Sequence, residues 1–389
     1  MSAGLRAGYK QTEVGVIPED WAELTVGELI EFQGGSQPEK SVFSSTPRPG
    51  FVRLIQIRDY KSDKFEVFAP ASLLRRFCDA NDIMIGRYGP PVFQILRGLS
   101  GAYNVALIKA CPLPEIDRDF AYFFLKQDSL FDFIDKLSRR SSGQTGVDLS
   151  ELRRYPLPLP PLPEQRAIAT ALSDVDALLG GLDRLIAKKQ GLKEATMQQL
   201  LTGQTRLPGF SGEWEVKRLG ELAHIKTGKR NNEDKVEDGT YPFFVRSDFV
   251  ERINSYSHDC EAILVPGEGR IGGIFHYING RFDVHQRVYA ITQFKPGVSA
   301  KFVHLYMRMH FGAWAMQNTV KATVDSLRLP TFENFEMHVP PTEDEQTAIA
   351  AVLSDMDSEL AALQARRTKT QALKKAMMQV LLTGRIRLI

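Results

Sequence analysis

The chain contains one long segment twice. Residues 165–207 return as residues 346–388 at a constant offset of 346 − 165 = 181, without a gap. The sequence LLTG, for example, occurs at 200–203 and again at 381–384. A repeat unit of this length is a whole domain rather than one rung of a solenoid. We therefore expect two similar halves.

A weaker repeat precedes each copy. Trp21 aligns with Trp214 and Gly35 aligns with Gly228, at an offset of 214 − 21 = 193. The regions around them are short apolar runs broken by Gly, Pro, Asn and Asp, a pattern that indicates mixed strands and helices. The fold class expected is α/β (α+β), with two mixed domains joined by two long helices.

The expected boundaries follow from this pattern. The segments are a first mixed domain at 1–158, a first helical segment at 159–207, a second mixed domain at 208–337 and a second helical segment at 338–389. The strands expected within the domains include 51–57, 83–85, 105–108, 241–245, 263–265 and 288–292, and the helices are 120–137 and 302–316.

Each helical repeat is expected to form one long helix. A proline-rich stretch precedes it, and Glu164 or Glu345 then places an acid in the first turn, which the helix dipole favours. Glycine at 203 and 384 fits the left-handed C-terminal cap. At 1.5 Å per residue, a helix from 165 to 200 is roughly 54 Å long.

The apolar residues of both helices recur at steps of four and three, the spacing of a coiled-coil seam. Lys193 and Lys374 interrupt the seam at corresponding places. Either the apolar stripe moves to another face there, toward Leu192 and Leu373, or the layer is solvated. The economical partner of each helix is the other copy, antiparallel by pseudo-twofold symmetry. An intermolecular coiled coil in a homodimer is the alternative.

Composition is that of an ordinary globular protein. Hydrophobic residues make up 43% of the 389 residues. The net charge is +2, so the charge alone does not indicate nucleic-acid binding. No apolar run resembles a signal peptide or a membrane span, which predicts a cytoplasmic protein. The three cysteines are far apart, so neither a disulfide framework nor a metal site is predicted.

No motif in the sequence predicts catalysis. The glycine-rich stretch 265–273 lacks the Lys-Ser/Thr of a phosphate-binding loop, so we interpret it as a turn between two strands. Dinucleotide and nucleophile signatures are absent from the sequence. We therefore expect no catalytic residue, no cofactor and no metal in this chain.

The layout resembles the specificity subunit of type I restriction-modification systems. The motifs that carry the resemblance are LPPLPEQ at 159–165, MQQLLTG at 197–203, VPP at 339–341 and MQVLLTG at 378–384, together with YKQTEVGVIPEDW at 9–21. The resemblance covers essentially the whole chain. It departs from the pattern where TEDE stands at 342–345 in place of LPE, one residue longer.

The resemblance implies a non-catalytic subunit that reads a split, asymmetric DNA target, one half with each mixed domain. The helices would set the distance between the half-sites and dock methyltransferase subunits, and a restriction subunit could join them. S-adenosylmethionine and ATP would then be bound by those partners. The low net charge agrees with partners that supply much of the grip on DNA phosphates.

The candidate DNA-reading residues are polar side chains beside the expected strands, because Arg and Gln offer paired hydrogen-bond donors to guanine and adenine edges. They are Arg53, Gln56, Arg58 and Lys61, with Asp59 among them, and Arg87 and Gln144 in the first domain, and Arg246, Ser247, Asp248 and Arg270 in the second. Two other hypotheses remain, a stand-alone DNA-binding regulator and a coiled-coil scaffold that binds proteins.

Overall fold

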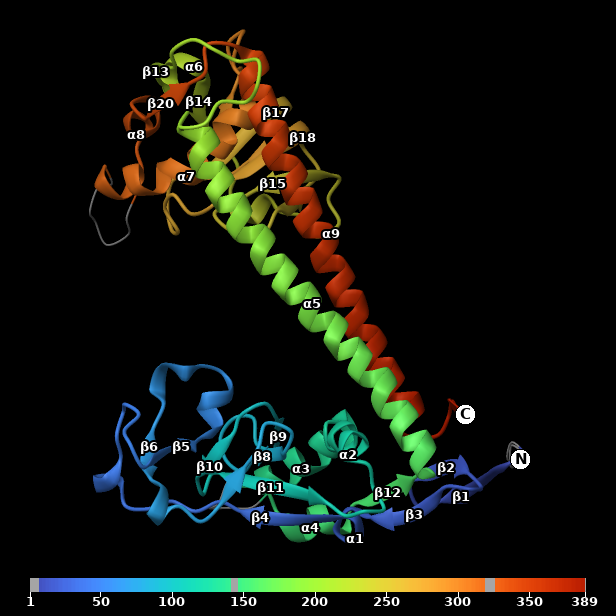
Figure 1. The fold of residues 1–389 in the computed structure, drawn as a ribbon. Helices are drawn as coiled ribbons and strands as arrows, with labels where there is room; N and C mark the ends of the chain where they lie inside the picture. The colour runs from blue at the N-terminus through green and yellow to red at the C-terminus, as the bar shows by residue number, and fades with distance from the viewer. Residues whose placement is uncertain (1–6, 141–145, 319–325, 389) are drawn as a thin grey trace. The chain divides into compact units, whose positions relative to one another are not determined.

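The computed structural model describes residues 7–140, 146–318 and 326–388. Its contacts divide the chain into two compact units (Figure 1). Unit 1 comprises Met1–Leu182 and Arg366–Ile389, and unit 2 comprises Asp183–Ala365. Each unit therefore contains one mixed domain and a part of both helical repeats.

Each helical repeat forms one uninterrupted helix, as predicted. Helix α5 spans Leu162–Leu201 and α9 spans Glu343–Leu381, 40 and 39 residues. Helix α5 begins at Leu162, slightly before the expected start, because Pro163 is tolerated in its first turn. Helix α9 begins at Glu343, and its first turn carries the expected acidic residues. Gly203 and Gly384 follow the helices with φ values of 71° and 70°, in the left-handed conformation predicted for the caps.

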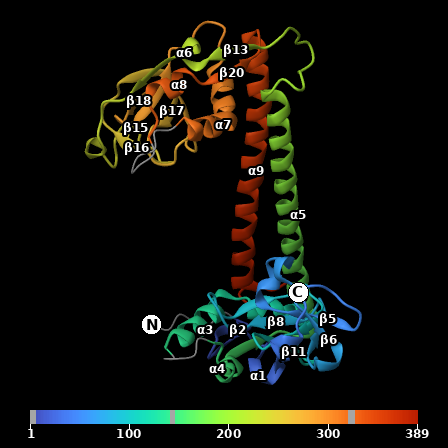
Figure 2. The same cartoon turned by 90° about the vertical axis from the view of Figure 1, so that its left-hand side faces the viewer.

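The two long helices lie side by side within each unit (Figures 1 and 2). In unit 1, Lys374 of α9 pairs with Asp176 of α5 over 2.6 Å. In unit 2, Lys193 of α5 pairs with Asp357 of α9. The two ion pairs are equivalent under the repeat, since 176 + 181 = 357 and 193 + 181 = 374. Pairing within one chain, in antiparallel order, confirms the expected coiled coil.

The polar interruption of the seam corresponds to neither of the two alternatives. Leu192 and Leu373 remain 51% and 55% exposed, so the apolar stripe does not move to their face. The Lys374 side chain is only 7% exposed, so its layer is not solvated. A carboxylate across the helix pair compensates the buried ammonium, which the sequence of one helix alone does not reveal.

The mixed domain of unit 1 is built on several small sheets. Two four-stranded sheets have the orders β6-β5-β10-β7 and β4-β11-β8-β9, and the pairs β1-β2 and β12-β3 complete the strands. All pairings are antiparallel except that of β10 with β5. The strands are β1 Tyr9–Thr12, β2 Gly15–Pro18, β3 Ala22–Thr25, β4 Ile30–Gly34, β5 Phe51–Ile55, β6 Phe68–Pro70, β7 Phe77–Cys78, β8 Ile83–Gly86, β9 Gln94–Leu96, β10 Gly101–Tyr103, β11 Leu107–Pro112 and β12 Pro156–Leu159.

Short helices cover this domain. They are α1 Val26–Leu29, α2 Arg118–Leu125, α3 Asp128–Arg140 and α4 Leu149–Arg154, with 3-10 turns η1 Lys40–Val42, η2 Ile57–Tyr60, η3 Asp63–Phe65 and η4 Ala71–Leu73. The prediction of one helix at 120–137 was wrong. The Lys126 amide caps α2 by donating to the Tyr122 and Phe123 carbonyls, and Asp128 starts a new helix with an acid in its first turn.

Unit 2 contains a six-stranded sheet of order β14-β19-β17-β18-β15-β16 and a pair β13-β20. The parallel pairing of β15 with β18 is the exception among antiparallel ones. The elements are β13 Glu215–Arg218, α6 Leu219–Leu222, β14 His224–Thr227, η5 Asn232–Asp234, β15 Tyr241–Phe244, β16 Glu251–Ile253, β17 His258–Pro266, β18 His276–Val284, β19 Val288–Thr292, α7 Ala300–Gln317, α8 Leu329–Glu333 and β20 Glu336–Val339. The stretch 265–273 links β17 to β18, as interpreted from the sequence.

A buried glutamate at the start of each long helix joins that helix to its domain. The Trp21 indole Nε1 donates to Glu164 Oε2 over 3.0 Å, and Arg387 Nη2 donates to the same oxygen over 2.7 Å. In unit 2, Arg206 Nη2 donates to Glu345 Oε2 over 2.6 Å. The acid predicted to favour the helix dipole is therefore also the acceptor for an arginine that follows the other helix.

The glutamine after each of these glutamates is buried too. Gln165 Nε2 donates to the Pro160 carbonyl over 2.8 Å, and Gln346 Nε2 donates to the Pro340 carbonyl over 3.2 Å. These bonds hold the proline-rich stretch against the first turn of the helix. Of the helices that the structure describes, none is both long and apolar enough to cross a membrane.

Candidate nucleic-acid interface

The first candidate cluster consists of Arg53, Gln56, Arg58 and Lys61, around the end of β5 and the turn η2. Arg53 lies between two carboxylates, with Nη2 2.9 Å from Asp63 Oδ1 and Nη1 2.7 Å from Glu66 Oε1. Its side chain is only 18% exposed. Arg53 is thus held inside the domain and is not free to approach a base edge in this conformation.

The turn η2 presents the other members of this cluster. The Gln56 backbone N–H donates to Asp59 Oδ2 over 2.9 Å, and burial raises the pKa of the Asp59 carboxyl. Arg58 is exposed and donates to the Phe65 carbonyl over 3.3 Å. Lys61 is exposed as well, and no partner for its ammonium occurs among the described residues. Arg58 and Lys61 are therefore the cations that this turn offers to a ligand.

Arg87 lies directly after β8. Its backbone is fixed, because its amide donates to the Ala106 carbonyl over 2.8 Å and its carbonyl accepts from the Val147 amide over 3.2 Å. Its guanidinium lies over the Tyr88 ring, 5.3 Å from the centroid, as a cation–π contact. Gln144, the remaining candidate in this domain, is outside the described residues.

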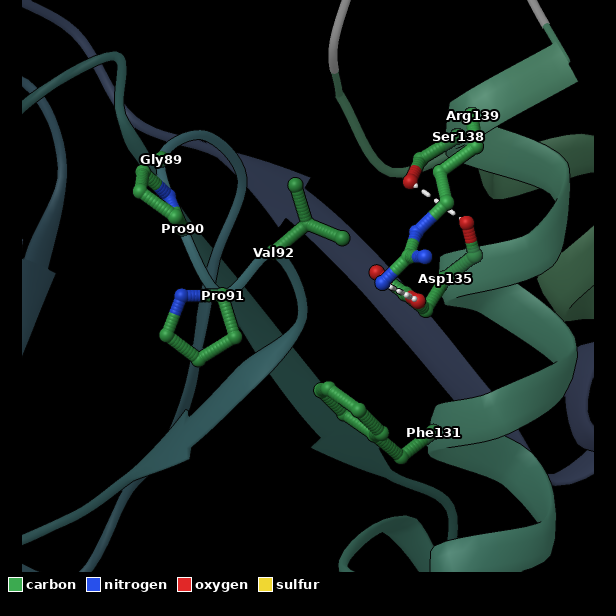
Figure 3. Close-up of a pocket in the computed structure, with 8 residues that line it drawn as sticks. All are labelled: Gly89, Pro90, Pro91, Val92, Phe131, Asp135, Ser138 and Arg139. Carbon is green, nitrogen blue, oxygen red and sulfur yellow. Dashed lines mark hydrogen bonds and ion pairs between the residues drawn. The ribbon is translucent and has the colours of Figure 1, made fainter. Parts of the chain in front are cut away.

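A hollow of about 580 Å³ lies between the loop after β8 and helix α3. Figure 3 shows Pro90, Pro91 and Val92 on one side of it and Phe131, Asp135 and Arg139 of α3 on the other, with Gly89 and Ser138 completing the lining. Arg139 Nη2 lies 2.7 Å from Asp135 Oδ2, so the charge at this rim is compensated. The hollow is mainly apolar and offers no cluster of donors for an anion.

The second candidate cluster consists of Arg246, Ser247, Asp248 and Arg270, and the structure brings its members together. Arg270 Nη1 pairs with Asp248 Oδ2, which ties the loop after β15 to the turn after β17. His276 Nε2 contacts the Ser247 carbonyl over 3.0 Å. Residues 22 positions apart in the sequence thus form one surface.

Arg246 belongs to a charge network at the edge of this cluster. Its Nη1 lies 3.2 Å from Glu268 Oε2, and Arg287 Nη1 lies 3.3 Å from Glu268 Oε1. Two guanidinium groups therefore share one carboxylate, and both side chains remain largely exposed. Exposed ion pairs of this kind are worth at most about 1 kcal/mol, so a nucleic acid can displace them.

Two residues of this surface were missed by sequence reasoning. Arg287 lies in the turn before β19, and Phe249 is 81% exposed beside the second candidate cluster. The Ser247 hydroxyl donates to the Phe249 carbonyl over 2.9 Å and so holds the loop that presents the ring. An aromatic residue following Arg246, Ser247 and Asp248 was the available signal, since an exposed ring can make apolar contact with a thymine methyl group in the major groove.

Similar proteins are known. The family described as the type I restriction modification DNA specificity domain matches residues 18–188 and 211–374. The type I restriction enzyme MjaVIII specificity subunit of Methanocaldococcus jannaschii is 25% identical over an alignment 411 residues long. The alignment covers 95% of this chain and 94% of that protein. The putative MjaX specificity subunit of the same organism is 25% identical, with 97% and 96% covered.

Solved structures share the fold. The S subunit of a type I restriction-modification system from M. genitalium has a TM-score of 0.65 at 17% identity, covering 93% of this chain and 96% of that one. A chain from a structure of the assembly of a type I restriction-modification system has a TM-score of 0.58 at 17% identity, with 95% and 99% covered. Since the family match spans both mixed domains and most of both long helices, this chain belongs to the type I restriction-modification DNA specificity family.

Proposed function

We propose that this chain is the DNA-reading specificity subunit of a type I restriction-modification complex and reads a split, asymmetric target. The observation that carries the proposal is a contrast between the two domains. Each domain joins its long helix through a buried glutamate at the equivalent position of the repeat, which is Glu164 in one and Glu345 in the other. Their candidate surfaces nevertheless differ, with Arg58 on η2 and Lys61 directly after it in one and the second candidate cluster in the other.

A shared framework with unlike surfaces suits two readers of different half-sites. Family membership and the names of the relatives support this assignment. In the proposal, α5 and α9 act as the spacer between the readers, because each helix runs through both units without interruption. The two readers would then recognise two short words separated by unread base pairs.

The proposal assigns catalysis to other subunits. Methyltransferase subunits would dock on this chain and bind S-adenosylmethionine, and a restriction subunit, if one joins, would bind ATP. This division of tasks is consistent with a net charge of only +2, since the partners can supply contacts to DNA phosphates. In the proposal, the complex acts on DNA in the cytoplasm, where the genome lies.

Co-expression with a type I methyltransferase subunit from the same genome tests the proposal. Sequencing of methylated bases in the host genome is expected to show a split motif, and the purified chain alone is expected to transfer no methyl group. Methylation by the isolated chain would contradict the non-catalytic role. An uninterrupted motif would contradict the two-reader arrangement. DNA binding without methylation by the complex would favour a regulator, and the absence of both would favour a scaffold.

Variants in each domain sharpen the test. Replacing Arg58 and Lys61 by alanine is expected to relax one half of the motif, and replacing Arg246 and Arg270 is expected to relax the other half, because each surface would contact only its own half-site. Arg281→Ala is the matched control, since Arg281 is an exposed arginine paired with Asp259 on the β17–β18 hairpin. Relaxation of both halves by one pair of substitutions would contradict the assignment.

A further inference from the structure

A hollow in unit 2 with charged residues in its lining has no role in the surfaces described so far. It has a volume of about 450 Å³ and lies at the end of β14. We call it the β14 hollow. Its lining residues are Lys226, Thr227, Gly228, Lys229, Arg230, Ser257, His258 and Asp283. Three cationic side chains against one carboxylate give the lining a charge of 3 − 1 = +2.

The carboxylate of the β14 hollow is already satisfied. Asp283 is buried, and its Oδ2 accepts from the Ser255 hydroxyl over 2.8 Å and lies 3.2 Å from Arg230 Nε. Its Oδ1 accepts from the Ser257 hydroxyl over 2.8 Å and from the Val284 amide over 3.0 Å. The negative charge of Asp283 is thus compensated by these donors. It therefore repels an incoming anion only weakly.

The lysines of the β14 hollow are not compensated in this way. Lys226 and Lys229 are both exposed, and neither ammonium group has a hydrogen-bond or ion-pair partner in the part of the chain that the structure describes. Arg53, Arg246 and Arg270, by contrast, all face carboxylates. The two ammonium groups are therefore available to a negatively charged ligand.

A glycine shapes the loop that carries these lysines. A Cβ atom on Gly228 would lie 1.9 Å from the Val284 carbonyl oxygen, so only glycine allows this close approach. Gly35, its counterpart in unit 1, shows the same distance to the Asn104 carbonyl oxygen. The close approach is thus shared between the domains.

The charge around the glycine is not shared. The 193-residue offset aligns Lys226, Lys229 and Arg230 with Gln33, Ser36 and Gln37, which are uncharged. The cations of the β14 hollow therefore have no charged counterparts at the aligned positions of the first domain.

The β14 hollow adjoins the network that contains Arg246. The Gln286 backbone N–H donates to the Arg230 carbonyl over 2.8 Å. Thr227 lines both the β14 hollow and a smaller hollow of about 240 Å³, whose lining also includes Gln286, Glu268 and Arg287. Glu268 is the carboxylate that Arg246 contacts. The lysines and the second candidate cluster thus belong to one continuous surface of unit 2.

We propose that the β14 hollow holds a backbone phosphate group of the bound DNA, with Lys226 and Lys229 as the cations that neutralise it. Ammonium groups bind phosphate as point charges and read no sequence. The hollow would anchor the duplex at a fixed register beside Arg246 and Arg270, which contact base edges. This inference rests on the proposed function and assigns the non-specific part of binding to named residues.

Salt dependence distinguishes a phosphate contact from a base contact. DNA affinity is measured for the full chain in complex with its methyltransferase subunit, over a range of salt concentrations. One probe is a duplex that carries the motif methylated by the complex. The other is a duplex that lacks this motif. Substituting Lys226→Gln and Lys229→Gln together is expected to reduce the magnitude of the slope of log affinity against log salt by about 0.9, the contribution of one phosphate contact. Affinity for both duplexes should fall by the same factor, on the order of tenfold to hundredfold at low salt.

The control and the outcomes separate this inference from the proposed function. Lys301→Gln is the matched control, because Lys301 is an exposed lysine of unit 2 outside the β14 hollow. If the wild-type complex does not distinguish the two duplexes, the proposed function itself fails. If it distinguishes them and the double variant keeps the wild-type slope, only the phosphate site is refuted. Binding of inorganic phosphate that the double variant loses, with an unchanged DNA slope, would assign the hollow to a free phosphate ligand and refute the proposal.

Discussion

The guanidinium of Arg387 contacts the buried carboxylate of Glu164, with Nη2 2.7 Å from Oε2, although 223 residues separate them in the chain. Arg206 and Glu345 make the equivalent contact in unit 2. Each contact ties the segment that follows one long helix to the first turn of the other. The repeat in the sequence therefore reappears as a repeated junction between helix and domain.

Removing the arginine from this junction should destabilise unit 1. Arg387→Met keeps the aliphatic stem but leaves the Glu164 carboxylate buried without its cation, and losses of about 3 kcal/mol are typical of such changes. Urea unfolding of the full chain measures the effect. Arg385→Met, at an exposed position nearby, is the control and should be nearly silent. Adding Glu164→Gln to Arg387→Met should recover part of the loss, and equal stability of the two arginine variants would refute the role of the junction.

The two partners of the seam ion pair should respond unequally to substitution. Asp176→Ala leaves the Lys374 ammonium, whose side chain is 7% exposed, without a carboxylate and should cost about 2 kcal/mol of unfolding free energy. Lys374→Met leaves only the more exposed Asp176, which water can hydrate, and should be nearly neutral. Thermal unfolding compares the two variants, and equal losses would show that the burial of the lysine is not what decides the effect.

Phe249 should contribute to DNA binding without contributing to folding. Its ring is 81% exposed beside the second candidate cluster, and burying such a ring against a thymine methyl group in the major groove is worth about 1–2 kcal/mol. Phe249→Ala should therefore weaken binding of the motif that the complex methylates by roughly tenfold, with thermal unfolding unchanged. Val216→Ala, at another exposed apolar residue of unit 2, is the control. Unchanged affinity would make Phe249 an ordinary surface residue.

His304 should make unit 2 sensitive to mild acid. Burial, with a smaller effect of Arg308, lowers the pKa of His304 to about 4, and its Nε2 is buried without a partner among the described residues. The unfolded chain takes up a proton below about pH 6.5, while the folded chain does not until about pH 4. Folding stability should therefore fall by about 2 kcal/mol as pH drops from about 7 to about 5.

A variant isolates this contribution of His304. His304→Phe removes the titrating group and should flatten the pH dependence of chemical unfolding between the same two pH values. His224→Phe, at an exposed position on β14, is the matched control. If the His304 variant loses as much stability as the wild type on acidification, another group is responsible for the pH dependence.

Local pattern predicted the long helices well. Their apolar spacing, their proline-bounded starts and the glycine after each end are features of neighbouring residues, and α5 and α9 show all three. The strand β19 also has its predicted bounds, Val288–Thr292. The helix expected at 120–137 was wrong because a break after Leu125 depends on capping contacts, which a run of apolar residues conceals.

The candidate site was less accessible to sequence reasoning. Residue type identified Arg53 as a possible base reader, but its two carboxylate partners come from the separate turn η3 and the residue after it. The ion pair between Arg270 and Asp248 likewise depends on how β17 and β15 are placed in one sheet. Whether a charged side chain is free or paired depends on residues that are far from it in the sequence. The type of the residue alone therefore does not predict its pairing.

The amino-acid sequence by itself determined that the chain has two related halves, each with a mixed domain and a long helix, because periodicity and capping act between residues a few positions apart. The tertiary structure alone decided which Lys meets which Asp across the helices, which arginines are held by carboxylates and where a basic hollow forms. These depend on distances between residues far apart in the chain, such as Lys193 and Asp357, and only folding brings such residues within reach of one another.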